Sequence, residues 1–301
     1  MSARTLRIGV DLGGSKIEAA ALDREGRIIF RKRRPTPPHD YDATLQAIRA
    51  LVEDAAAGDA EASIGIGIPG AVSPATGLVK NANSTWLNGR PLTLDLERLL
   101  GRPVRAANDA NCFAISEATD GAAAGMSPVF GVILGTGVGG GIVIEGRVLT
   151  GADAIAGEWG HTPLPSPEPE ERPGERCWCG RDGCLETWIS GPALARDHRR
   201  ATGRDWTAAE IARAADAGDA GAEASLARFD SRIARGLAVV VNILDPAVIV
   251  LGGGLSNLQR LYRTLPALLR PLVFSDRLAV RLMPPMHGDS SGVRGAAWLW
   301  P

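Results

Sequence analysis

The pattern of apolar and polar positions near the start of the chain predicts two strands joined by a tight turn. Apolar residues alternate with small or polar ones over 6–10, the stretch 11–14 interrupts the run with an aspartate and glycines, and apolar residues resume over 17–22. The same pattern recurs in VFGVILGTGVGGGIVIEG, with a glycine turn at 135–141. Gly13 and Gly137 lie about 124 residues apart, which indicates an internal duplication with one such turn in each domain.

A third glycine turn follows a run of apolar residues in AVIVLGGGLSNLQRLYRTL. Here the pattern predicts a buried strand that ends in Gly252, Gly253 and Gly254, followed by a helix. Glycines at such turns let the backbone approach a ligand and present its N–H groups to phosphate oxygens. One turn alone would indicate only a change of chain direction, but three turns at strand ends favour a bound nucleotide.

Two common nucleotide-binding motifs do not fit these turns. Gly135, Gly137 and Gly140 match G-x-G-x-x-G, but a Rossmann fingerprint requires a helix directly after the glycines, and the β-branched stretch IVIEG follows instead. The chain also has no G-x-x-x-x-G-K-[ST], which excludes a P-loop NTPase. With these two motifs excluded, the best remaining choice is the actin-like ATPase architecture, in which paired β-hairpins hold phosphates from two sides.

Asn108 and Asp109 lie between a predicted strand and a predicted helix in VRAANDANCFAISEATDG. A carboxylate at a helix N-terminus is favoured by free N–H groups and by the helix dipole, so an ordinary N-cap is the simplest explanation of Asp109. The functional alternative is a general base that accepts the proton of an attacking hydroxyl during phosphoryl transfer. In that case Asp11 would orient Mg²⁺ through water and Lys16 would reach a phosphate, although a lysine after a turn is more often a solvated surface residue.

Four potential zinc ligands lie close together in the sequence: His161, Cys177, Cys179 and Cys184. Three thiols and one imidazole complete a tetrahedral Zn²⁺ shell, and a closed shell of this kind is structural. Disulfides are the alternative, but residues 1–12 contain too short an apolar stretch for a secretory signal, so we expect a reducing, cytoplasmic location. The remaining thiol, Cys112, lies in an apolar helical pattern, which predicts that it is an inert core residue.

Several polar residues near this cluster and elsewhere suit a sugar. Glu158 precedes His161 and Glu186 follows Cys184, so a metal that fixes the loop would also fix two carboxylates able to bind sugar hydroxyls. The loop NANSTWLNG over 81–89 offers three asparagines, which can donate and accept, although such turns are also common for backbone reasons. The stretch 163–176 is proline-rich and acidic, and it predicts an exposed loop without regular structure, a passive insertion rather than a lid.

Composition and charge narrow the class of protein. The 301 residues are 45% hydrophobic and 22% charged, which is typical of a globular protein with one large or two smaller domains. A formal net charge of −1 argues against a nucleic-acid partner, whose binding depends on neutralising phosphates. No apolar stretch approaches the ~18 residues needed to span a bilayer, so we expect no membrane partner.

With these motifs in place, the chain resembles the ROK family of sugar kinases and sugar-responsive repressors over nearly its whole length. The resemblance is carried by DLGGSK, GIGIPGAV, the Asn-Asp pair, LGTGVGGG, GEWGH, CWCGRDGCLET and VIVLGGG. GEWGH and CWCGRDGCLE together are highly specific to the family. NANSTWLNG and HGDSSGVRGAAWLW look closest to its bacterial fructokinases, also called manno(fructo)kinases.

The resemblance implies an α/β protein with the actin-like (ribonuclease H-like) two-domain fold, with ATP and sugar in the cleft between the domains. We place an N-terminal domain at 1–118, completed by a helix at 291–301, and a C-terminal domain with the zinc site at 119–290. The resemblance also implies a homodimer, with a hexose, ATP, Mg²⁺ and structural Zn²⁺ as the small molecules and metals bound.

Individual roles follow by position. The resemblance implies that Asp109 is the catalytic base and that the sugar contacts Asn83, Asn108, Asp109, Glu158, His161 and Glu186. His161 would also bind zinc beside Cys177, Cys179 and Cys184. The nucleotide would contact the glycine turns and their neighbours: Asp11, Gly13, Gly14, Lys16, Thr136, Gly137, Gly253 and Gly254.

The sequence therefore predicts an ATP-dependent hexose kinase that phosphorylates the 6-hydroxyl of fructose, with mannose or glucose as further substrates. A glucokinase or an N-acetylhexosamine kinase of the same family is the alternative within this class. A non-catalytic sugar-sensing repressor would need a helix-turn-helix segment, and only ten residues precede Asp11. A chaperone-like ATPase is the remaining rival, and sugar-dependent ADP release would separate it from a kinase.

Overall fold

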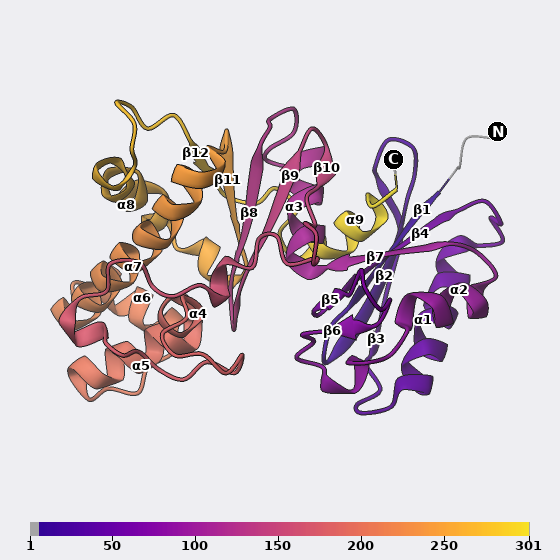
Figure 1. Cartoon of the computed structure of the whole chain (residues 1–301), viewed down its shortest axis with the longest axis horizontal. Coiled ribbons are helices and arrows are strands. Elements are labelled where there is room, and N and C mark those ends of the chain that lie inside the picture. Colours follow the sequence, from indigo (N-terminus) through magenta and orange to yellow (C-terminus); the bar gives the residue numbers. More distant parts are fainter. Residues whose placement is uncertain (1–5, 301) are drawn as a thin grey trace. The chain divides into compact units, whose positions relative to one another are not determined.

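A computed structural model describes residues 6–300 of the chain (Figure 1). Its contacts divide it into two compact units. The first unit comprises residues 1–125, 141–156 and 286–301, and the second comprises 126–140 and 157–285. The domain boundaries expected from the sequence stay a prediction, because compactness of contacts does not by itself define a domain.

The first unit is built on a five-stranded sheet with the order β3-β2-β1-β4-β7. Its strands are β1 (Arg7–Leu12), β2 (Lys16–Leu22), β3 (Ile28–Pro35), β4 (Ser63–Ile68) and β7 (Val104–Asn108). The first three pair in antiparallel fashion, and β4 and β7 add to β1 in parallel. The predicted strand–turn–strand at the start of the chain is therefore confirmed, and its turn is closed by the Gly13 N–H, which donates to the Lys16 carbonyl at 3.0 Å.

Four helices and a small hairpin complete this unit. They are α1 (Tyr41–Ala56), α2 (Leu92–Leu100), α3 (Asp109–Thr119), α9 (Ser291–Ala297) and the hairpin β5 (Ala71–Val72) with β6 (Val79–Lys80). The predicted core position of Cys112 is confirmed, since this α3 residue is fully buried.

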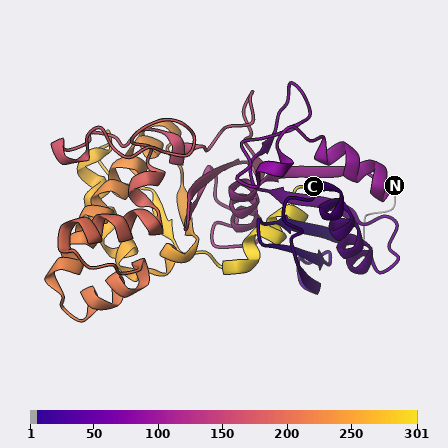
Figure 2. The same cartoon turned by 90° about the horizontal axis from the view of Figure 1, so that it is seen from below.

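The C-terminal helix α9 packs directly on strands β1, β2 and β4 and on helix α3, as Figure 2 shows for the yellow helix beside the indigo strands. Two strand glycines make this approach possible. A Cβ atom on Gly9 would overlap the carbonyl oxygen of Val293, and one on Gly65 would overlap that of Ala296. The helix therefore sits closer to the sheet than any side chain on these two strand positions would allow.

The second five-stranded sheet has the order β10-β9-β8-β11-β12. Its strands are β8 (Val129–Leu134), β9 (Val138–Ile144), β10 (Arg147–Val148), β11 (Val248–Gly252) and β12 (Arg281–Met283). As in the first sheet, three consecutive strands lie side by side and two later strands extend the sheet in parallel. This repeated order supports the internal duplication predicted from the glycine turns.

Besides strands β8, β11 and β12, the second unit contains helices (Figure 1). They are α4 (Glu186–Ile189), α5 (Gly191–Thr202), α6 (Ala208–Asp216), α7 (Ala220–Leu244) and α8 (Gln259–Leu269). The helix expected directly after the third glycine turn begins later, because a 3-10 turn over Gly254–Asn257 comes first. Within residues 6–300, no helix is both long and apolar enough to cross a bilayer.

The stretch 163–176 departs from its prediction in one respect. Most of it is exposed, as expected, but Leu164 and Glu171 are buried, and a 3-10 turn covers Pro169–Glu171. The Glu171 carboxylate accepts hydrogen bonds from Arg232 and Arg235 of α7. A buried carboxylate needs such partners, so this loop is anchored to the helix rather than being a loose insertion.

Candidate functional site

The Asn-Asp pair lies where β7 ends and α3 begins, and the two residues have different tasks. Asn108 is the N-cap: its Oδ1 accepts from the Ala110 N–H at 2.8 Å, and its Nδ2 donates to the Gly70 carbonyl at 3.1 Å. Asp109 is the first helical residue and is exposed, with one carboxylate oxygen 2.8 Å from the same Ala110 nitrogen. The cap role proposed for Asp109 thus falls to Asn108, and the Asp109 carboxylate is presented at the positive end of the helix dipole.

Asp11 is a half-buried acid near the end of β1, beside the first glycine turn. Burial raises its pKa and the nearby Glu18 raises it further, while Lys16 and Arg33 act in the opposite direction. A Cβ atom on Gly292, at the start of α9, would lie only 3.0 Å from an Asp11 carboxylate oxygen. The C-terminal helix therefore forms part of the wall around this carboxylate.

The asparagine loop lies beside the same turn, since a Cβ atom on Gly14 would be 3.4 Å from the Ser84 hydroxyl. Asn88 is structural: its side chain accepts from the Ala82 N–H and donates to the Ala82 carbonyl, both at 2.9 Å. Asn83 is exposed at the middle of the loop. The amide that holds the loop and the amide predicted to bind sugar are therefore different residues.

The other residues predicted to contact the nucleotide all lie at strand ends. Gly13 and Gly14 form the β1–β2 turn, Lys16 is the exposed first residue of β2, Thr136 and Gly137 form the β8–β9 turn, and Gly253 and Gly254 directly follow β11. The Gly135 N–H donates to the Gly137 carbonyl at 3.0 Å, which closes the second turn over one residue fewer than the first.

Glu186, the first residue of α4, is held by two donors from different parts of the second unit. Its Oε2 accepts from the backbone N–H of Val138 at 2.9 Å, and its Oε1 accepts from the indole N–H of Trp178 at 2.7 Å. A Cβ atom on Gly137 would lie 2.7 Å from the same Oε2, so a side chain at this position would displace the carboxylate. A residue predicted to bind sugar and a turn predicted to bind nucleotide thus meet within one unit.

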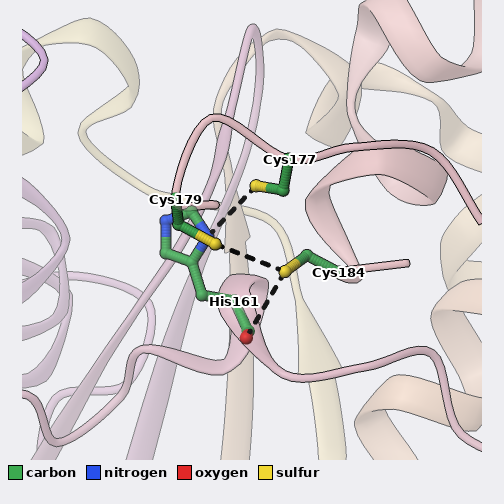
Figure 3. A group of neighbouring side chains, drawn as sticks. All are labelled: His161, Cys177, Cys179 and Cys184. Atoms are coloured by element: carbon green, nitrogen blue, oxygen red, sulfur yellow. Dashed lines mark hydrogen bonds between the residues drawn. The ribbon is translucent and has the colours of Figure 1, made fainter. Parts of the chain in front are cut away.

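His161, Cys177, Cys179 and Cys184 come together as the sequence predicts, and Figure 3 shows their side chains around one small space. Their four potential ligand atoms all lie within 4.8 Å of one another. The Cys177 sulfur is 3.6 Å from Nδ1 of His161, and the Cys179 and Cys184 sulfurs are 3.6 Å apart. His161 ends a 3-10 turn over Trp159–His161, and the half-buried Glu158 precedes that turn.

The two separations of 3.6 Å fit a tetrahedral metal, although the four ligand atoms together spread over as much as 4.8 Å. Zinc–ligand bonds of about 2.3 Å to sulfur and about 2.0 Å to nitrogen give ligand separations of roughly 3.6–3.8 Å. Burial raises the pKa of the Cys177 and Cys184 thiols, whereas at Cys179 hydrogen bonds from Arg181 and from the other thiols outweigh burial and lower the pKa to about 6. Cys179 is therefore the thiol that most readily gives the thiolate that binds metal. The four side chains form a donor set that suits one zinc ion.

Two residues of this region were not predicted from the sequence. Trp178 lies between two cysteines of the cluster, yet its contact with Glu186 depends on how the loop turns back over eight residues. Glu171 stands in an acidic, proline-rich stretch, and its partners lie on α7, 61 and 64 residues later. The sequence singles out Trp178 only as a tryptophan between two cysteines, and it does not distinguish Glu171 from the other glutamates of its stretch.

The residues predicted to contact the sugar are divided between the two units. Asn83, Asn108 and Asp109 belong to the first unit, and Glu158, His161 and Glu186 belong to the second. Asn108 ends β7, and Asp109 and Glu186 begin α3 and α4, whereas His161 ends a 3-10 turn and Asn83 lies in a loop.

Comparison with known proteins identifies the group to which this architecture belongs. The family model described as "ROK family" matches residues 7–301. The chain belongs to the ROK family. Its solved structural neighbours include a ROK hexokinase from Thermus thermophilus, with 34% identity, a TM-score of 0.85 and coverage of 98% of this chain and 97% of that one. Another is a ROK family glucokinase from Streptomyces griseus, solved with glucose and AMPPNP, with 31% identity, a TM-score of 0.77 and coverage of 97% and 98%.

These neighbours confirm the actin-like ATPase fold expected for a ROK protein. Curated relatives are N-acetyl-D-glucosamine kinases. One from Pectobacterium atrosepticum is 40% identical over 296 residues, covering 97% of both chains. One from Pasteurella multocida is 39% identical over 301 residues, covering 98% of this chain and 99% of the relative. These relatives support sugar-kinase activity for this ROK chain. The sugar in their names is N-acetyl-D-glucosamine, whereas the sequence analysis predicted fructose.

Proposed function

We propose that this ROK protein is an ATP-dependent kinase that phosphorylates the 6-hydroxyl of N-acetyl-D-glucosamine. The observation that carries the proposal is the 40% identity to an N-acetyl-D-glucosamine kinase over 97% of both chains. Fructose is the second candidate, because the segments NANSTWLNG and HGDSSGVRGAAWLW resemble those of bacterial fructokinases. The relatives favour the amino sugar over the fructose of our first prediction.

In the proposed mechanism Asp109 accepts the proton of the attacking hydroxyl. Its position at the first turn of α3 favours the ionised carboxylate, and the N-cap position itself is taken by Asn108. Asn83, Asn108, Glu158, His161 and Glu186 would bind the other sugar hydroxyls. Such contacts fix the reacting oxygen relative to the base, which is the main task of a protein in phosphoryl transfer.

ATP would be held by backbone N–H groups of the three glycine turns, with Lys16 and Thr136 beside the phosphates. Asp11 would hold Mg²⁺ through water, and the bound ion would offset negative charge on the phosphates. The half-buried position of Asp11 suits this task, because a nearby cation stabilises a carboxylate whose charged form is otherwise disfavoured by burial.

The four-residue cluster is proposed to bind one structural Zn²⁺. With Nδ1 of His161 facing the sulfurs, the opposite ring nitrogen is available to a sugar hydroxyl, so the same residue can serve both the metal and the substrate. The homodimer and the cytoplasmic location stay predictions.

A coupled ADP-release assay over N-acetyl-D-glucosamine, fructose, mannose and glucose tests the proposal. Wild-type protein should release ADP only when sugar is present, with the highest kcat/KM for N-acetyl-D-glucosamine. A higher kcat/KM for fructose would overturn N-acetyl-D-glucosamine as the proposed substrate and would favour the fructokinase activity predicted from the sequence. ADP release that no sugar stimulates would overturn the kinase itself and favour a chaperone-like ATPase.

A further inference from the structure

Trp178 is an exposed tryptophan placed between two of the proposed zinc ligands. Its side chain is 60% exposed, which is unusual for the largest apolar side chain. It stands directly between Cys177 and Cys179, so its backbone is fixed on both sides by residues of the cluster. Its ring meets the His161 ring edge-on, with the centroids 4.9 Å apart and the planes at 84°.

The polar end of the indole points to Glu186. An indole N–H can only donate, and this one donates to Glu186 Oε1 at 2.7 Å. The other carboxylate oxygen accepts from the Val138 N–H at 2.9 Å. Glu186 is therefore held at one oxygen by the β8–β9 turn and at the other by the metal loop, and two donors at opposite oxygens fix the plane of the carboxylate as well as its position.

We propose that Trp178 is a positioning residue: through its indole N–H, the metal loop fixes the orientation of the Glu186 carboxylate. This inference rests on the proposed function, in which Glu186 binds a sugar hydroxyl. Without the indole donor, the carboxylate keeps only its Val138 contact and can rotate about it. The sugar would then meet a carboxylate in the wrong plane, while the base Asp109, which belongs to the other unit, is unaffected.

The substitution Trp178→Phe tests this role, because it keeps an aromatic ring against His161 and removes the donor. The loss of one hydrogen bond to a charged group predicts a rise of about tenfold in the KM for sugar and in the sugar Kd measured by calorimetry. The kcat, the KM for ATP and the zinc content should change by less than about twofold. Trp206→Phe is the matched control, since Trp206 lies in the same unit and stacks on His198, outside this contact.

A double-mutant cycle separates positioning of Glu186 from a general effect on the loop. In a Glu186→Ala background, where no carboxylate remains to be oriented, Trp178→Phe should change the sugar Kd by less than about twofold. The same tenfold change in both backgrounds, an unchanged sugar Kd in the single variant, or loss of zinc from it would each overturn the inference. A wild-type protein without sugar-dependent ADP release would instead overturn the proposed function, and the two failures are thus distinguishable.

Discussion

The substitution Glu171→Gln is expected to lower the free energy of unfolding by about 3 kcal/mol. The carboxylate is 7% exposed and accepts from Arg232 at 2.7 Å and from Arg235 at 2.8 and 2.9 Å. Its second oxygen also accepts from the backbone N–H of Glu168 at 2.8 Å. The glutamine side chain would keep the shape but would offer the two arginines a neutral partner with only one acceptor oxygen.

The magnitude follows from what each arginine retains. Removing one partner of a buried ion pair costs about 3–5 kcal/mol because the remaining charge is left without compensation. Here Arg232 still donates to Asp197 at 3.0 Å, and Arg235 still donates to the Ser166 carbonyl at 2.7 Å, so the low end applies.

The pKa of Glu171 supports a loss of unfolding free energy of the same size. Burial alone would raise this pKa, but hydrogen bonds from Arg235 and Arg232 lower it from 4.5 to about 2. That difference corresponds to about 3 kcal/mol at most, since solvent screening reduces it. Because the folded pKa is the lower one, the stabilisation is fully present above pH 4.5 and is lost as the pH falls toward 2.

Urea unfolding at pH 7 followed by circular dichroism measures the effect, with Glu53→Gln as the matched control. Glu53 pairs with Arg49 on the exposed face of α1 at 2.7 Å, and such pairs contribute less than about 0.5 kcal/mol. The difference between wild type and Glu171→Gln should also shrink below pH 4.5. If Glu171→Gln stayed within about 1 kcal/mol of the control, or if its deficit did not change in acid, the reasoning would be wrong.

Four further outcomes are expected. Asp109→Asn should keep the circular dichroism spectrum and lower kcat by at least about 10²-fold, because the general base is lost; near-normal turnover would contradict its role. Elemental analysis should find about one zinc per chain, and Cys184→Ser should lower that content; wild-type protein without metal would refute the site. Gly65→Ala should lower the melting temperature by several degrees, since its Cβ would overlap the Ala296 carbonyl; an unchanged melting curve would show that α9 can shift at no cost. The ³¹P NMR spectrum of the product should show a 6-phosphate, and phosphate on the anomeric carbon would exclude the proposed transfer.

The parts of the structure that the sequence predicted are those governed by local patterns. Alternation and glycine turns located β1, β2, β8 and β9 because a strand shows its two faces within a few residues. The four ligands of the proposed zinc site were predictable for a similar reason, since His161 and the three cysteines lie within one short stretch.

What the sequence did not predict depends on contacts between distant residues or on a single residue boundary. The buried state of Glu171 follows from arginines 61 and 64 residues away, which no local pattern reveals. The sequence also left open whether Asp109 capped its helix, because the answer depends on whether α3 begins one residue earlier or later. The structure assigns the cap to Asn108.

The place of α9 has a consequence for how the chain matures during synthesis. Strands β1 and β4 are translated before the second unit, but the helix that covers their glycines is translated after it. Domains usually fold in the order in which they emerge. In this protein the unit that starts first cannot complete its core until all of the second unit has been made.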